Sequence, residues 1–211
     1  MAGETWTQSQ THYISCDPLN RCGGGDRTPV PRSLPVIRTL AALVAAALAA
    51  GTASADSYKL TGDNTTVSFV GSKPDGKHTG GFKKLEGTAE VADGALKGLE
   101  VTIQCDSIHS DNDKLTGHLK SPDFFNVKEH ATAVVKVTKV EKTAKGYTLS
   151  GDLTMCGKTG PFEMPATVEV KDGVLTIASD FKLDRTKWGM TYGKGKVNDE
   201  VELKVAVTAK K

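Results

Sequence analysis

The residues of this chain that could do chemistry are few, and their spacing favours binding over catalysis. The histidines after residue 55 do not pair with one another or with cysteines at the spacing of a metal site. Asp111 and Asp113 lack the glycine turn and terminal glutamate of a calcium loop. No serine elbow, phosphate loop or dinucleotide fingerprint occurs in the same region. We therefore predict that the protein is not an enzyme and has no metal or cofactor.

Arg185 is the only arginine after residue 55, in a region that contains 22 lysines. A planar guanidinium binds carboxylate or phosphate in a fixed geometry and tolerates partial burial better than an ammonium group. We therefore predict a specific paired role for Arg185. Two such roles are open: a structural ion pair with Asp184 or Asp199 at a strand end, and recognition of a lipid head group.

Cys105 and Cys156 are the two cysteines of this region. Alternation along each strand puts Cys105 on an apolar face and Cys156 on a polar face, and side chains on opposite faces are not bridged without a bulge. We expect two independent thiols, with a disulfide as the alternative.

The elements that must position these residues are strands, because polar and apolar residues alternate with period two. Asp93-Gly94 and Asp172-Gly173 predict hairpin turns. A helix is expected near 111–119, and a second short helix at Ser121-Pro122, with Ser121 as N-cap. The predicted antiparallel strands are 58–60, 66–71, 81–91, 99–105, 132–140, 147–155, 166–170, 175–183 and 201–207.

The predicted sheet must bury its apolar face, and the chain has no long amphipathic helix to cover it. We predict an all-β fold: an antiparallel closed or nearly closed β-barrel of about eight strands, lipocalin-like, with one or two short helices capping the mouth. Many inward positions carry small or medium side chains, so we expect an elongated apolar cavity. A two-sheet sandwich with a dry core is the alternative.

Residues 32–55 have the pattern of a secretory signal peptide, with basic residues, an apolar run at 40–50 and an Ala-x-Ala sequence ending at Ala55. The run is shorter than the roughly twenty residues that cross a bilayer. We predict cleavage near Ala55 and a periplasmic or secreted domain at 56–211. Residues 1–31 are interpreted as a disordered leader or a misassigned start.

The charge of residues 56–211 is nearly balanced, since 22 lysines and one arginine face 22 acidic residues. The lysines alternate with acids and threonines, as on solvated strand faces, rather than clustering with aromatics. Nucleic acid is therefore not an expected partner.

Three segments, at 117–127, 151–154 and 184–189, resemble the YceI family of exported, lipocalin-like barrels that carry long isoprenoid or other lipid chains. The resemblance covers about 57–209. It implies an exported carrier or store for a long-chain apolar lipid, a polyisoprenoid or isoprenoid quinone, bound in the barrel cavity.

On this resemblance we assign candidate ligand-binding residues near the mouth. The apolar candidates are Phe82, Leu119, Phe124, Phe125, Trp188 and Met190. The polar candidates for a head group are His78, His118, Lys120 and Arg185. Phe124 and Phe125 have a purely structural alternative, a plug at one end of the barrel.

A second function remains open, a non-catalytic periplasmic interaction or stress-protective scaffold. Its partner would be a membrane redox protein or a second copy, because family members associate as homodimers. A transient membrane contact fits either function.

Overall fold

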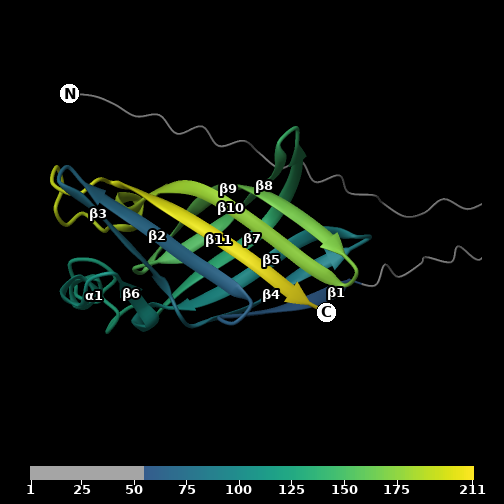
Figure 1. Ribbon diagram of the computed structural model, residues 1–211, viewed down its shortest axis with the longest axis horizontal. Helices are drawn as coiled ribbons and strands as arrows, with labels where there is room; N and C mark the ends of the chain where they lie inside the picture. Colours follow the sequence, from purple (N-terminus) through teal and green to yellow (C-terminus); the bar gives the residue numbers. More distant parts are fainter. Residues whose placement is uncertain (1–54) are drawn as a thin grey trace, which may run out of the picture. The chain divides into compact units, whose positions relative to one another are not determined.

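The computed structural model describes residues 55–211, which form an all-β barrel with little helix (Figure 1). The one α-helix of this range and two 3-10 turns lie between strands. The elements are β1 (Asp56–Thr61), β2 (Thr65–Lys73), β3 (Gly76–Phe82), β4 (Leu85–Ala92), β5 (Ala95–Gln104), η1 (Cys105–Ser107), β6 (Ile108–Ser110), α1 (Asp113–Leu119), β7 (Thr132–Thr143), β8 (Gly146–Met155), β9 (Lys158–Lys171), β10 (Val174–Asp184), η2 (Arg185–Trp188) and β11 (Glu200–Lys210).

The eleven strands of residues 55–211 pair antiparallel in the order β1-β4-β5-β7-β8-β9-β10-β11-β2-β3-β6. The two edges of this sheet are short, and the edge strand β1 packs beside β11. Lys211 Nζ lies 2.6 Å from Asp56 Oδ1 at this junction. The predicted antiparallel, nearly closed barrel is confirmed, with eleven strands in place of about eight.

Alternating burial forms the core of the barrel. In β10, Leu175 and Ile177 are buried while Thr176 between them is exposed. Inward positions on β1 and β8 carry Leu60 and Leu149, which are also fully buried. The period-two pattern of the sequence therefore predicts which side chains face the inside of the barrel and which face solvent.

The predicted strand at 81–91 is wrong, because the chain forms two strands there with a break at Lys83 and Lys84. Lys83 N donates to Ser107 O (3.3 Å), whereas Lys84 O accepts from Gln104 N (3.0 Å). The chain changes its pairing partner at this corner, since β3 before it pairs with β6 and β4 after it pairs with β5. The alternation shifts by one residue at the corner, because Phe82 and Leu85 both face inward and Lys83 and Lys84 between them are both exposed. The two consecutive lysines were a sign of the break that the predicted strand overlooked.

Strand β9 begins at Lys158, well before the predicted start at Ala166. Its early part contains Pro161 and Pro165, which argue against a central strand. Residues 158–166 pair with β8 only, and pairing with β10 begins at Thr167. The missing proline N–H groups therefore cost no ladder bond on the β10 side.

The predicted helix at Ser121-Pro122 is also wrong. Asn126 N donates to Ser121 O (2.9 Å), Phe125 N donates to Leu119 O (3.1 Å), and Asn126 has a left-handed φ of 45°. These bonds fold the segment into consecutive turns. The helix expected near 111–119 is present as α1, where the Asn112 side chain caps Leu115 N (3.1 Å).

Candidate functional site

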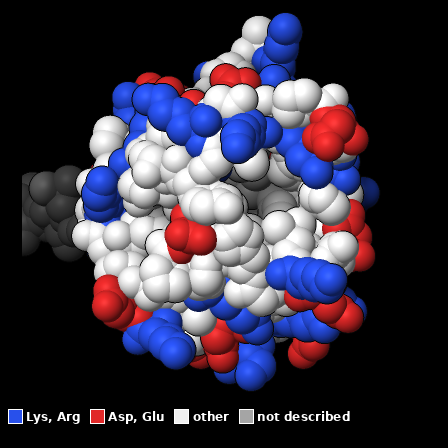
Figure 2. Space-filling model, turned by 90° about the vertical axis from the view of Figure 1, so that its left-hand side faces the viewer, with Lys and Arg blue, Asp and Glu red and all other residues white. Residues whose placement is uncertain are grey.

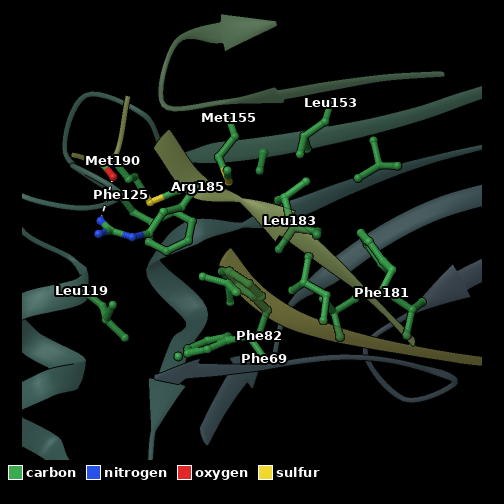
Figure 3. Close-up of a pocket in the computed structure, with 18 of the residues that line it drawn as sticks. Phe69, Phe82, Leu119, Phe125, Leu153, Met155, Phe181, Leu183, Arg185 and Met190 are labelled. Carbon is green, nitrogen blue, oxygen red and sulfur yellow. Dashed lines mark hydrogen bonds between the residues drawn. The ribbon is translucent and has the colours of Figure 1, made fainter. Parts of the chain in front are cut away.

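An apolar cavity of about 360 Å³ occupies the interior of the barrel. The inward faces of β2, β5, β7, β8, β10 and β11 line it, and its deep part is formed by buried side chains such as Leu60, Ile177 and Val207. Figure 3 shows Leu119, Phe125, Arg185 and Met190 grouped at one end of the cavity. Such a space suits a hydrocarbon chain, since it offers no polar partners along most of its length.

The mouth of the cavity lies at the left of Figure 1, where three segments meet. They are the β2–β3 hairpin, α1 with the turns that follow it, and residues 189–199 after η2, which we call the mouth loop. Figure 2 views this end and shows a hollow surrounded mainly by uncharged residues, with most charged side chains farther out. The cavity therefore opens through a largely uncharged face.

Aromatic side chains form much of the mouth. The rings of Phe82 and Phe125 meet edge to face with centroids 5.6 Å apart, and Phe124 lies 5.4 Å from Tyr192. All four line the cavity, and Tyr192 is 47% exposed. Phe124 and Phe125 thus narrow the opening and face the cavity at once, so the plug and the lining interpretations are compatible. Their contact with a ligand stays a prediction.

Two histidine–aspartate pairs stand at the mouth. His78 Nδ1 lies 2.9 Å from Asp111 Oδ1, and His118 Nε2 lies 2.8 Å from Asp123 Oδ2. Asp111 also accepts from Thr79 N, and this bond, followed by that to His78, holds the pKa of its carboxyl below the usual value. The pairs join β3 to the start of α1 and α1 to the turns after it.

Arg185 is buried, and it organises the mouth loop. Its Nη1 donates to Met190 O (2.7 Å) and Tyr192 O (2.9 Å), and its Nε donates to Asn198 O (3.1 Å). Its Nη2 donates to Val197 O and to Asp199 Oδ1, both at 3.3 Å. These bonds use all five guanidinium N–H groups. The ion pair with Asp199 is therefore present, and no donor is left for a head group.

Asp184, the other acid considered for Arg185, caps the turn η2 instead. Its Oδ1 accepts from Thr186 N (2.9 Å) and from Thr186 Oγ1 (2.6 Å). These bonds hold the pKa of the Asp184 carboxyl below its ordinary value. The cap fixes where β10 ends and the Arg185 turn begins.

Eight of the ten predicted site residues line the cavity: His78, Phe82, His118, Leu119, Phe124, Phe125, Arg185 and Met190. Two do not. Lys120 is the C-cap of α1 and lies outside the lining, and Trp188 is buried in the barrel wall, where its Nε1 donates to Leu153 O (2.8 Å). Lys120 and Trp188 were predicted as site residues because they belong to the segments 117–127 and 184–189, but neither side chain lines the cavity.

Several lining residues were missed by sequence reasoning. Lys73 and Tyr192 stand at the mouth, and the wall includes Phe69, Phe162, Met164, Phe181 and Leu183. Strand alternation marked the inward face of β10 and could have identified Phe181 and Leu183. Nothing comparable marked Lys73 or Tyr192, which lie at a strand end and in a loop.

Cys105 and Cys156 are both free thiols. They follow β5 and β8, and β7 lies between these strands in the sheet. Burial raises the pKa of the Cys105 thiol to about 11 and also raises that of Cys156. Cys156 Sγ lies 3.6 Å from Phe124 O, so this thiol contacts the turns at the mouth. Neither thiol is activated as a nucleophile, because the thiolate is disfavoured at both positions.

The fold and its cavity define a lipocalin-like β-barrel with an apolar interior. A family model described as the YceI-like domain matches residues 58–209. The chain therefore belongs to the YceI-like family, as the sequence motifs predicted.

Curated relatives support this membership. A UPF0312 protein of Pectobacterium carotovorum is 29% identical over 189 residues, covering 81% of this chain and 95% of that protein. A UPF0312 protein of Azotobacter vinelandii is 31% identical over 193 residues, covering 81% and 96%. Protein YceI of Escherichia coli is 32% identical over a shorter stretch of 89 residues, covering 41% and 47%.

Solved structures share the fold. BcnA of Burkholderia cenocepacia matches with a TM-score of 0.63 and 21% identity, covering 69% of this chain and 96% of that one. A polyisoprenoid binding domain from Saccharophagus degradans matches with a TM-score of 0.57 and 13% identity, covering 74% and 99%.

Two other features, a membrane-spanning helix and a cluster of metal-ligating side chains, are absent from residues 55–211. In this range no helix is long and apolar enough to cross a membrane. Nor do three or more His, Cys, Asp or Glu side chains of the range gather where they could hold a metal ion. The segment 1–31 and the predicted signal peptide at 32–55, apart from its last residue Ala55, lie outside the described residues.

Proposed function

We propose that this protein binds one long-chain apolar lipid inside the barrel and acts as its exported carrier or store. The observation that carries the proposal is the cavity of about 360 Å³, apolar along most of its length and open at an aromatic mouth. Each CH₂ group moved from water into such a cavity contributes about 0.8 kcal/mol before the costs of association are subtracted. A flexible hydrocarbon is therefore the ligand class that this interior favours.

The ligand we propose is a polyisoprenoid or an isoprenoid quinone. The fold shared with the polyisoprenoid binding domain of Saccharophagus degradans supports this choice. An apolar tunnel discriminates by length and bulk, so we expect loose selectivity along the chain and a narrower choice at the mouth. Export to the periplasm and cleavage near Ala55 are part of the proposal and rest on the signal pattern at 32–55.

The test uses the full chain, expressed with its own leader in a bacterial host and purified from the periplasmic fraction without detergent. Native mass spectrometry should show one stoichiometric lipid adduct, which solvent extraction then identifies. The intact mass should correspond to a chain that begins at Asp56. We also propose a homodimer, as the family resemblance implies, and a species of twice the mass in the same spectrum would support it.

An empty protein that also fails to take up added isoprenoids would contradict the carrier. That result would favour a scaffold that acts through a protein partner. An uncleaved chain retained in the cytoplasm would contradict export without bearing on lipid binding.

A further inference from the structure

A second hollow, a surface groove, lies directly outside the mouth. Its walls are residues 73–75 at the tip of the β2–β3 hairpin and residues 192–197 of the mouth loop. Lys73, Tyr192 and Val197 line both the groove and the cavity. The groove therefore continues the cavity to the surface, and a chain that leaves the barrel on this side passes into it.

The groove carries more positive than negative charge. Lys73, Lys194 and Lys196 line it, against the single carboxylate of Asp75, which pairs with Lys73 at 3.6 Å. Neither Lys194 nor Lys196 forms an ion pair with any residue in 55–211. Figure 2 shows Lys and Arg side chains along the upper rim of the hollow, on the side of the β2–β3 hairpin and mouth loop in Figure 1. Two uncompensated ammonium groups thus stand beside the opening.

The backbone of the mouth loop is compatible with an anion in the groove. The carbonyl oxygens of Met190, Tyr192 and Val197 accept from Arg185, as does that of Asn198. These oxygens, which would repel an anion, are thereby directed toward the guanidinium. Among the residues that line the groove, Asp75 of the hairpin carries the one carboxylate, against three ammonium groups.

The two walls of the groove are also fixed to each other. Asn198 N donates to Ser72 O (2.9 Å), and Asn198 Nδ2 donates to Ser72 Oγ (2.8 Å). Within the loop, Lys196 N and Val197 N both donate to Gly193 O at 2.8 Å. The groove therefore exists before any ligand arrives, which lowers the ordering cost of binding.

We propose that this groove binds the phosphate or pyrophosphate group of a phosphorylated isoprenoid whose chain lies in the cavity. The inference rests on the proposed function and narrows its ligand, because an apolar chain in the barrel leaves its polar end at the mouth. Ammonium groups bind phosphate as mobile point charges and do not require the fixed geometry of an arginine fork. Arg185 is fully engaged, so Lys194 and Lys196 are the cations that remain.

The test measures displacement of an apolar fluorescent dye from delipidated protein by geranylgeranyl pyrophosphate and by geranylgeraniol, which share one chain and differ in the head group. At about 0.05 M salt we expect the pyrophosphate to bind about tenfold more tightly. The double variant Lys194→Gln, Lys196→Gln should lose most of this advantage, and so should the wild type at about 1 M salt. Affinity for the alcohol should stay within about twofold in the same variant.

The matched control is Lys97→Gln with Lys171→Gln, which removes two exposed lysines at the opposite end of the barrel. It should keep the full preference for the pyrophosphate. Inorganic pyrophosphate is the third arm. It should weaken binding of the prenyl pyrophosphate and leave the alcohol unaffected, because it competes for the groove alone.

The outcomes separate this inference from the proposed function. Equal affinity of the two prenyl ligands in the wild type would overturn the phosphate site while leaving the carrier intact. Inorganic pyrophosphate that binds without weakening the binding of geranylgeranyl pyrophosphate would also overturn it. The groove would then bind free pyrophosphate but not the head group of the prenyl ligand. Failure of both prenyl ligands to displace the dye would overturn the proposed function itself.

Discussion

Arg185 shows how one side chain determines the form of the mouth. A loop with glycines at 189, 193 and 195 has little intrinsic preference for one conformation, and all three glycines adopt positive φ. The guanidinium gathers four carbonyl oxygens of this loop around one charge. The presence of a single arginine among many lysines predicted a paired role, but not that its partners are mainly backbone.

Replacing Arg185 by lysine should lower the free energy of unfolding by about 3 kcal/mol or more. An ammonium group cannot reach the spread acceptors, and buried carbonyls left without a donor are costly. Urea denaturation followed by circular dichroism measures the change. Lys187→Met, in the same 3-10 turn but exposed, should change the stability by no more than about 0.5 kcal/mol. Equal effects of the two changes would refute this role of Arg185.

Cys105 should make stability fall at alkaline pH. Its pKa is raised from 9.0 to about 11 in the folded protein. The folded state therefore favours the neutral thiol, and this contribution is complete below pH 9 and is lost as the pH rises through about 11. The difference in unfolding free energy between wild type and Cys105→Ala, measured by urea titration from pH 8 upward, should shrink over that range. A pH-independent difference would contradict the assignment.

At the scale of elements, regular strands were predicted more accurately than the points at which they are interrupted. β10 and β11 follow the alternation of their side chains closely. The corner at Lys83 and Lys84 shifts the alternation by one residue, and a single strand drawn through it overlooks the two consecutive exposed lysines. β9 was predicted too short at its start, where residues 158–166 pair with β8 only. Pairing on one side alone is a tertiary property that the local sequence does not report.

The residues of the candidate site were likewise predicted only in part. Apolar residues near the Phe124–Phe125 segment could be assigned, since a mouth that opens an apolar cavity needs them. Trp188 and Lys120 were assigned to the site because they lie close to lining residues along the chain. Lys120 directly follows Leu119, and one residue separates Trp188 from Met190, but only Leu119 and Met190 line the cavity.

Strand β10 offers a matched pair for testing the cavity. Ile177, which is 1% exposed, lines the deep part, and Thr176 beside it faces outward. Ile177→Trp should fill the deep part and shorten the longest isoprenoid that binds, whereas Thr176→Trp should leave the chain-length limit unchanged. Dye displacement by a series of prenols of increasing length measures the limit. An unchanged limit in both variants would place the ligand outside the barrel.

At the scale of the whole molecule, stability should depend on the lipid. Much of the barrel interior is open space lined by side chains that would otherwise pack against one another. Ligand present at about a hundred times its dissociation constant adds about 2.7 kcal/mol to the free energy of unfolding. Calorimetry of the protein before and after solvent extraction should show a lower melting temperature for the extracted form, restored by added lipid. Identical melting temperatures would contradict a cavity ligand.

Trp188 gives the barrel a built-in optical reporter. It is the only tryptophan of residues 56–211, it is 2% exposed, and its indole donates to the carbonyl of Leu153, whose side chain faces the cavity. A ligand that pushes on Leu153 alters the hydrogen bond of the single emitting ring. Intrinsic fluorescence should therefore follow filling and emptying of the cavity in real time, without a label, once the leader with its Trp6 is absent.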